Sequence, residues 1–110
     1  ELSLEINKGN LYVNYAHGRY GYWKYTFRYR NSDLYLIGYD QVDGDAVVDS
    51  ELSINFLSKK KQKKVNTNEN AQGGDEVFKE TWSNITVNNL LKLRDIKDFE
   101  NFEEVDMLKY

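Results

Sequence analysis

Aromatic side chains are the residues of this sequence best suited to binding chemistry. Eight of the nine tyrosines lie between Tyr12 and Tyr39, and planar rings stack on sugar faces with a large contact area at low entropic cost. Tyr20 and Tyr22 lie beside glycines in a predicted loop, where binding residues are often found. The alternative is that most of the rings pack in the core of a β-protein. The candidate ligand-binding residues are Tyr20, Tyr22, Trp23, Tyr39 and Arg28.

Arg28 also has a structural interpretation. It falls in the middle of a predicted strand, on its polar side, and Asp40 and Glu51 lie on the segments that follow. Opposite charges on neighbouring strands attract each other across a sheet. We therefore expect an ion pair between Arg28 and one of these carboxylates rather than a ligand contact.

Aspartates between residues 40 and 49 form a second candidate site. Calcium prefers several oxygen ligands from a flexible loop, and Asp43-Gly44-Asp45 offers such oxygens. The order differs from an EF-hand loop, which needs Asp-x-Asp-x-Asp-Gly and a later glutamate. Calcium is the one candidate cofactor, and the alternative is a solvated acidic turn near Asp49. The candidate metal ligands are Asp40, Asp43 and Asp45.

Basic residues are concentrated in one run, Lys59-Lys60-Lys61-Gln62-Lys63-Lys64, which holds five of the fifteen. Such a run attracts phosphates of nucleic acid or of an anionic membrane surface. No aromatic residue interrupts it to stack on bases, and outside it ten basic residues face eighteen acidic ones. A nucleic-acid binder needs a broad basic face, so we expect this chain not to bind nucleic acid. The run instead predicts an exposed edge strand whose lysines block pairing with other chains.

Catalytic motifs are missing from the chain. His17 is the single histidine, there is no cysteine, and no Gly-x-Ser-x-Gly elbow is present. The eighteen acidic residues neither identify nor exclude a pair of catalytic carboxylates across a cleft. We expect a protein that is not an enzyme, with His17 as a hydrogen-bonded loop residue.

These side chains are positioned by predicted strands. Trp23, Tyr25, Phe27 and Tyr29 alternate with polar residues over 22–30, which is the period of a strand with one wet face. Asn31-Ser32-Asp33 has turn chemistry, and 34–40 returns as a second strand with both faces covered. This hairpin is the expected centre of the sheet.

Alternation predicts further strands over 2–6, 11–16, 48–56, 60–66 and 76–83. Turns are expected at 7–10 and 41–45, and the longest loop at 68–75. Residues 85–93 are mixed and compatible with one more strand. Apolar residues then recur every three positions from Ile96 to Val105, which predicts a short helix or 3₁₀ turn over 96–104.

Short strands joined by polar turns predict one all-β domain over residues 1–110, mainly an antiparallel meander, as a sandwich or a barrel. No run approaches the ~18 apolar residues that a membrane helix needs. The chain starts at Glu1 and its one methionine is Met107. We therefore expect a trimmed or mature portion of a longer precursor.

The central stretch resembles uncharacterised exported proteins of Gram-negative bacteria, including Bacteroidetes. In them a Tyr-x-Phe-Arg-aromatic strand precedes Leu-Ile-Gly, and a Ser-x-Asn-aromatic-Leu segment follows. The resemblance covers about the first sixty residues and implies an exported β-rich domain, periplasmic or on the cell surface, with no known activity. The matching residues are Tyr25, Phe27, Arg28, Tyr29, Leu36, Ile37, Gly38, Tyr39, Asp40, Ser53, Asn55, Phe56, Leu57 and Ser58.

The first functional expectation is a binding or interaction module that presents a sheet face or loops to a protein or a glycan. One alternative is a β-barrel that binds a small ligand or a metal. The other is an immunity-type toxin inhibitor, because residues 95–106 hold six acidic residues and only Lys97 as a base. An acidic surface would be steered toward a basic active site.

Overall fold

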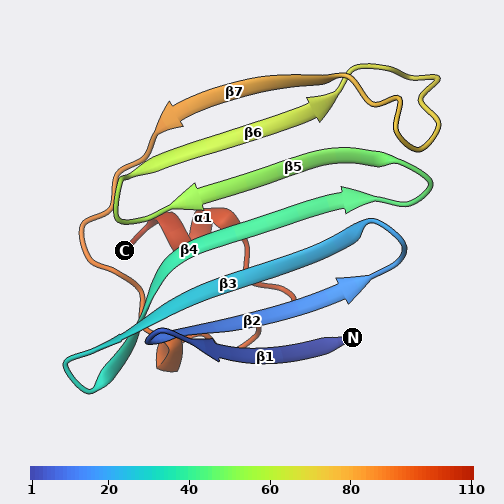
Figure 1. The fold of residues 1–110 in the computed structure, drawn as a ribbon. Coiled ribbons are helices and arrows are strands. Elements are labelled where there is room, and N and C mark those ends of the chain that lie inside the picture. Colours follow the sequence, from blue (N-terminus) through green and yellow to red (C-terminus); the bar gives the residue numbers. More distant parts are fainter.

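Seven antiparallel strands follow one another in the chain and in the sheet (Figure 1). The computed structural model describes all residues from 1 to 110. β1 and β7 form the two edges, so the sheet is open and single, and the predicted meander is confirmed. The strands are β1 (Leu2–Asn7), β2 (Asn10–His17), β3 (Gly21–Arg30), β4 (Asp33–Gly44), β5 (Val48–Asn55), β6 (Lys60–Asn66) and β7 (Phe78–Asn84).

Two-residue turns fix the register of two hairpins. Lys8 and Gly9 have φ angles of 52° and 82°, and Asn31 and Ser32 have φ angles of 52° and 63°. Positive φ at both central residues is the type I′ geometry, whose twist matches that of the flanking strands. The turn expected at 41–45 begins later, because β4 continues to Gly44.

Residues 85–110 cross one face of the sheet with little regular structure (Figure 1). They contain a 3₁₀ turn, η1 (Leu93–Asp95), and a short helix, α1 (Glu104–Leu108). A short C-terminal helix is confirmed, but its expected place at 96–104 is wrong. The three-residue recurrence comes instead from an irregular segment that packs Ile96, Phe99 and Phe102 against the sheet. Residues 85–93 form no strand, only a bridge between Lys92 and Tyr35.

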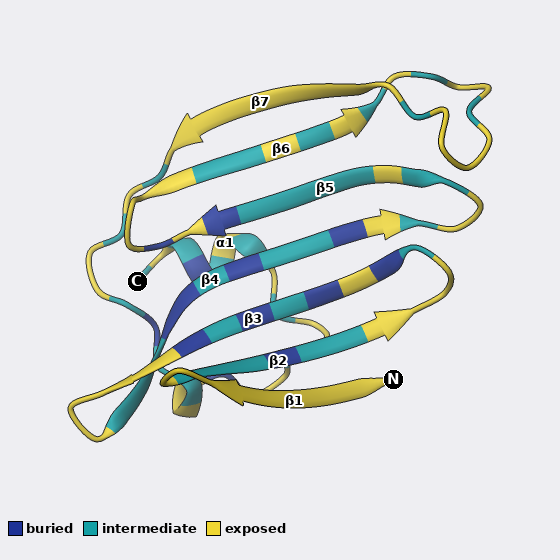
Figure 2. Cartoon of the chain, viewed as in Figure 1, coloured by how far each residue is buried: buried dark blue, intermediate teal, exposed yellow.

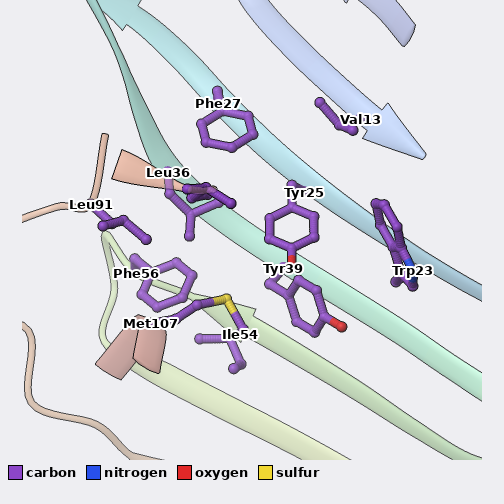
Figure 3. Packing of buried hydrophobic residues seen from close by; sticks show 11 residues of the cluster. Val13, Trp23, Tyr25, Phe27, Leu36, Tyr39, Ile54, Phe56, Leu91 and Met107 are labelled. Carbon is purple, nitrogen blue, oxygen red and sulfur yellow. The ribbon is translucent and has the colours of Figure 1, made fainter. Parts of the chain in front are cut away.

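The hydrophobic core lies between the sheet and this C-terminal segment (Figure 3). A β-bulge between Thr26 and Phe27 leaves Ile37 as an extra residue in β4. Leu36 and Tyr39 therefore both face the core although three positions separate them. The Tyr25 hydroxyl donates a 2.9 Å hydrogen bond to the Phe99 carbonyl. The buried cluster is Val13, Trp23, Tyr25, Phe27, Leu36, Tyr39, Ile54, Phe56, Leu91, Ile96 and Met107.

The edge strands β1 and β7 are exposed along their whole length (Figure 2). The lysine run is therefore not an edge: β6 pairs with β5 on one side and with β7 on the other. The prediction of an exposed edge at 60–66 is wrong because β7 adds one more antiparallel strand. One lysine of the run, Lys61, forms an ion pair with Glu104 of α1.

Candidate functional site

One face of the sheet faces away from the core, and we call it the open face. It is defined by a row of register neighbours, one per strand from β2 to β7: Asn14, Lys24, Asp40, Ser53, Gln62 and Trp82. Asp40 joins three strands, because it lies 3.8 Å from the Lys24 ammonium and accepts a 2.8 Å hydrogen bond from the Ser53 hydroxyl. This polar row fixes the side chains of the face.

One hollow on the open face lies at the end where β2 turns into β3. It measures about 500 Å³, and we call it the tyrosine hollow. The rings of Tyr20 and Tyr22 line this hollow together with polar and aliphatic side chains. Its lining includes Asn14, Arg19, Tyr20, Tyr22, Val48 and Glu51.

The β2–β3 turn positions both rings. A Cβ atom at Gly21 would lie 2.6 Å from the His17 carbonyl oxygen, so only glycine allows the chain to close this turn. Tyr20 is held by Arg19, whose guanidinium carbon lies 5.3 Å from the ring centroid in a cation–π contact. Tyr22 follows Gly21 on the open face with 40% of its surface exposed.

The Tyr22 hydroxyl is protonated near neutral pH, as a phenol ordinarily is. Partial burial raises the pKa of Tyr22, and the negative charges of Asp40 and Glu51 raise it further. A neutral phenol both donates and accepts hydrogen bonds. The hollow therefore combines a neutral hydroxyl, an amide, a cation and a carboxylate around two ring surfaces.

The long loop over 67–77 borders the same end of the sheet. The Glu76 carboxylate accepts hydrogen bonds of 3.2 Å from the Val48 amide and 2.8 Å from the Gly74 amide. This contact ties the loop to the start of β5. Gly73 lies against the Tyr20 hydroxyl, because a Cβ atom there would be 3.3 Å from it. The loop therefore packs next to the Tyr20 hydroxyl, whereas Arg19 contacts the ring.

The structure separates the five residues predicted to bind a ligand. Tyr20 and Tyr22 line the tyrosine hollow, whereas Trp23 and Tyr39 are buried in the core cluster on the other face. The reason is strand parity, since adjacent residues such as Tyr22 and Trp23 point to opposite faces. Trp23 and Tyr39 instead border a second hollow of about 480 Å³ beneath residues 99–104.

Arg28 joins neither hollow and forms no ion pair. Its register neighbours are Asn10 and Tyr35. The expected partner Asp40 lies opposite Lys24 and pairs with it. The prediction of an ion pair at Arg28 is therefore wrong, because the register of β3 and β4 places the aspartate four residues nearer the start of β3.

The three aspartates proposed as metal ligands are not brought together. Asp40 lies on the open face, whereas Asp43 lies on the opposite face and accepts a 2.9 Å hydrogen bond from Gln41. Asp45 is exposed in the turn that follows β4. No group of three histidine, cysteine, aspartate or glutamate side chains has a geometry for holding a metal ion.

His17 ends β2 rather than lying in a loop, and its ring forms no hydrogen bond. Its nearest aromatic neighbour is Tyr15, with ring centroids 6.0 Å apart. The hydrogen bond expected for this residue is thus not formed.

Trp82 is a surface residue that the sequence analysis did not select. It stands on the open face of β7 with 60% of its surface exposed, and its indole N–H donates to the Glu80 carboxylate. The sequence contained a signal for this exposure, because Phe78 and Trp82 share their strand face with the charged residue Glu80 rather than with further apolar residues.

Comparison with protein-family models, with curated proteins and with solved structures found no match. None of the helices is long and apolar enough to cross a membrane.

Proposed function

We propose that this chain is a non-enzymatic binding module whose tyrosine hollow takes a glycan. The observation that carries the proposal is the placement of Tyr20 and Tyr22 in one hollow with Asn14, Arg19 and Glu51. The hollow is within the ~300–1,000 Å³ of typical small-ligand sites. This is the aromatic surface expected from the sequence, reduced to the two rings that share a face.

The chemistry of the hollow suits a sugar better than an apolar ligand. A sugar ring offers C–H faces that stack on aromatic rings and hydroxyl groups that need hydrogen-bond partners when they leave water. Asn14, Glu51 and the Tyr22 hydroxyl supply such partners from β2, β5 and β3. Each of these strands is held by a neighbour on both sides, so the groups are positioned before the ligand binds.

A glycan titration tests this proposal. We expect one member of a panel of oligosaccharides to raise the melting temperature, because a ligand that binds only the folded chain stabilises it. In calorimetric titration, Tyr20→Ala and Tyr22→Ala should each weaken binding about tenfold, or ~1.4 kcal/mol. Tyr29→Ala is the control, since Tyr29 is an exposed tyrosine outside the hollow. A panel without any binder, or an equal loss in the control, would refute the proposal.

An immunity-type inhibitor is the second candidate function. Asp98, Glu100 and Glu103 are exposed on the C-terminal segment, and none of them forms an ion pair. Hydrogen bonds from Asn101 lower the pKa of Asp98 and keep it charged. Binding to one of a panel of basic nucleases should then weaken steeply with salt and disappear with Glu100→Lys and Glu103→Lys together.

Export is a separate part of the proposal and rests on the resemblance of the first sixty residues. We place the chain in an exported bacterial protein, in the periplasm or on the cell surface. Fractionation of the source cells tests the location, and recovery with the cytosolic proteins would contradict it.

The ligand-binding barrel expected as an alternative needs a closed sheet, whereas this sheet is open.

A further inference from the structure

β1 carries an apolar row that nothing in the chain covers. Leu2, Leu4 and Ile6 lie opposite Tyr15, Val13 and Leu11, and therefore on the core face of the sheet. The C-terminal segment does not reach over them, and they are 59%, 67% and 80% exposed. Three large aliphatic side chains in one exposed row are unusual for a surface that stays in water.

Backbone N–H and C=O groups of β1 also lack hydrogen-bond partners at the residues of this row. Ala16 donates a 3.0 Å hydrogen bond to the Glu1 carbonyl and accepts one from the Glu1 amine. Hydrogen-bonded pairs alternate along an antiparallel ladder, so Ser3 and Glu5 also face β2. The N–H and C=O groups of Leu2, Leu4 and Ile6 therefore point away from β2.

The other edge is protected against pairing, and β1 is not. On the core face β7 carries Lys79, Thr81 and Ser83, and charged or polar side chains there discourage edge-to-edge pairing. β1 has its charges, Glu1 and Glu5, only on the opposite face. An edge that is apolar, unpaired and unguarded is a site for adding a strand.

We propose that two copies of this chain pair through β1, antiparallel and related by a twofold axis at Leu4. The added strand is the same segment of the second copy. Leu4 then lies opposite its own copy, and Leu2 lies opposite Ile6 of the second copy. The outward N–H and C=O groups of these residues pair with one another, and the two sheets become one continuous sheet.

Charge selects this register among those that the backbone allows. With the axis at Leu4, Ser3 faces Glu5 of the second copy and no like charges meet. An axis at Ser3 would place Glu1 opposite Glu5, and an axis at Glu5 would place this residue opposite itself. Like charges directly opposite destabilise a sheet, so the Leu4 axis is both the best paired and the least repulsive.

The apolar surface continues from the row into a groove of about 350 Å³. Eight of the nine residues that line it are hydrophobic, among them Leu2, Leu4, Leu93 and Phe99. A dimer about Leu4 places two such grooves on one side of a joint sheet. Because one six-residue strand from each copy forms the contact, we expect a weak interface of the kind that buries less than ~1,200 Å². Its dissociation constant should be on the order of ten to a hundred micromolar.

Sedimentation equilibrium on the chain of residues 1–110 tests the dimer. We expect a monomer at about 1 μM and a dimer at about 500 μM. Leu4→Lys, which brings two like charges to the axis, should raise the dissociation constant at least tenfold. Thr81→Lys on the other edge is the matched control and should leave it unchanged. Both positions are exposed, and equal melting curves by circular dichroism would confirm that both variants fold.

Amide hydrogen exchange gives an independent readout of the same pairing. The amides of Leu4 and Ile6 should gain protection as the protein concentration rises, because only the second copy gives them partners. The amides of Ser3 and Glu5 bond to β2 and should be protected at every concentration. A monomer at 500 μM, a dimer that survives Leu4→Lys, or protection that ignores concentration would overturn the proposal.

Discussion

The Tyr39 side chain shows how one buried hydroxyl couples the core to pH. Burial raises the pKa of Tyr39 to about 12, and the negative charges of Asp43, Glu104 and Asp40 add to the effect. Its hydroxyl donates a 2.7 Å hydrogen bond to Gln41, which holds it neutral. A tyrosine in the unfolded chain has a pKa of ~10. Above that pH the folded chain therefore keeps a proton on Tyr39 that the unfolded chain loses.

We therefore predict a loss of stability between about pH 10 and pH 12. The folded pKa is raised, so the contribution of Tyr39 is complete below pH 10 and declines as pH approaches 12. Urea unfolding at pH 9, 10.5 and 11.5 measures the decline. Tyr39→Phe should make the decline shallower without abolishing it, because burial also raises the pKa of Tyr25. Tyr29→Phe, which removes an exposed hydroxyl, should leave the decline unchanged. Equal slopes for Tyr39→Phe and the unaltered chain would contradict this account.

The secondary-structure element α1 is a helix of five residues that packs against the core. Helices this short are not stable on their own, so α1 depends on what its side chains contact. Met107 is 2% exposed in the core cluster, whereas Val105 on the same helix is 65% exposed.

Truncating the buried side chain of α1 should therefore be costly. We predict that Met107→Ala lowers the free energy of unfolding by about 2–5 kcal/mol, the usual range for a core methionine. Val105→Ala is the matched control, with an expected change within about 0.5 kcal/mol. Urea unfolding at neutral pH measures both. Similar values for the two variants would show that α1 does not pack as described.

The Glu76 carboxylate joins the loop over 67–77 to the start of β5. Hydrogen bonds from its own amide, from Val48 and from Gly74 lower the pKa of Glu76. The bonds persist above the ordinary pKa of a glutamate and weaken as pH falls through the lowered value, because a protonated carboxyl accepts them poorly.

We predict that Glu76→Ala makes this loop a site of rapid proteolysis without unfolding the sheet. Cleavage within 68–77 should accelerate several-fold, because local opening precedes cleavage. Glu69→Ala is the control, since Glu69 lies exposed in the same loop and forms no hydrogen bond through its side chain. Limited proteolysis followed by mass spectrometry measures both rates, and equal rates would rule out an anchoring role for Glu76.

The whole molecule consists of one sheet, and residues 85–110 pack on one face of its central strands. β3 and β4 share most of the buried side chains, whereas β1 and β7 have none (Figure 2). Local stability follows burial. We predict that, at micromolar protein concentration, amides of β3 and β4 exchange at least a hundredfold more slowly than those of β7. Uniform protection across the sheet in a native-state exchange experiment would contradict a core confined to the centre.

Local chemistry predicted much of the fold and little of the site. Alternation located all seven strands, and the Asn31-Ser32 turn needed only its own residues. The helix was misplaced because the spacing from Ile96 to Phe102 reflects contacts with the sheet rather than helical periodicity. The candidate binding residues were split because sequence shows ring type and neighbours but not which rings residues 85–110 will bury.

Alternation and turn chemistry in the sequence predicted the seven strands and their antiparallel succession, because these depend on neighbours a few residues apart. Tertiary contacts decided which strands are edges, which face is covered and which tyrosines remain outside. The pairing of β7 with β6 makes β7 an edge, and the path of residues 85–110 covers one face of the sheet. Such contacts depend on how whole surfaces pack, and no short stretch of sequence contains that information.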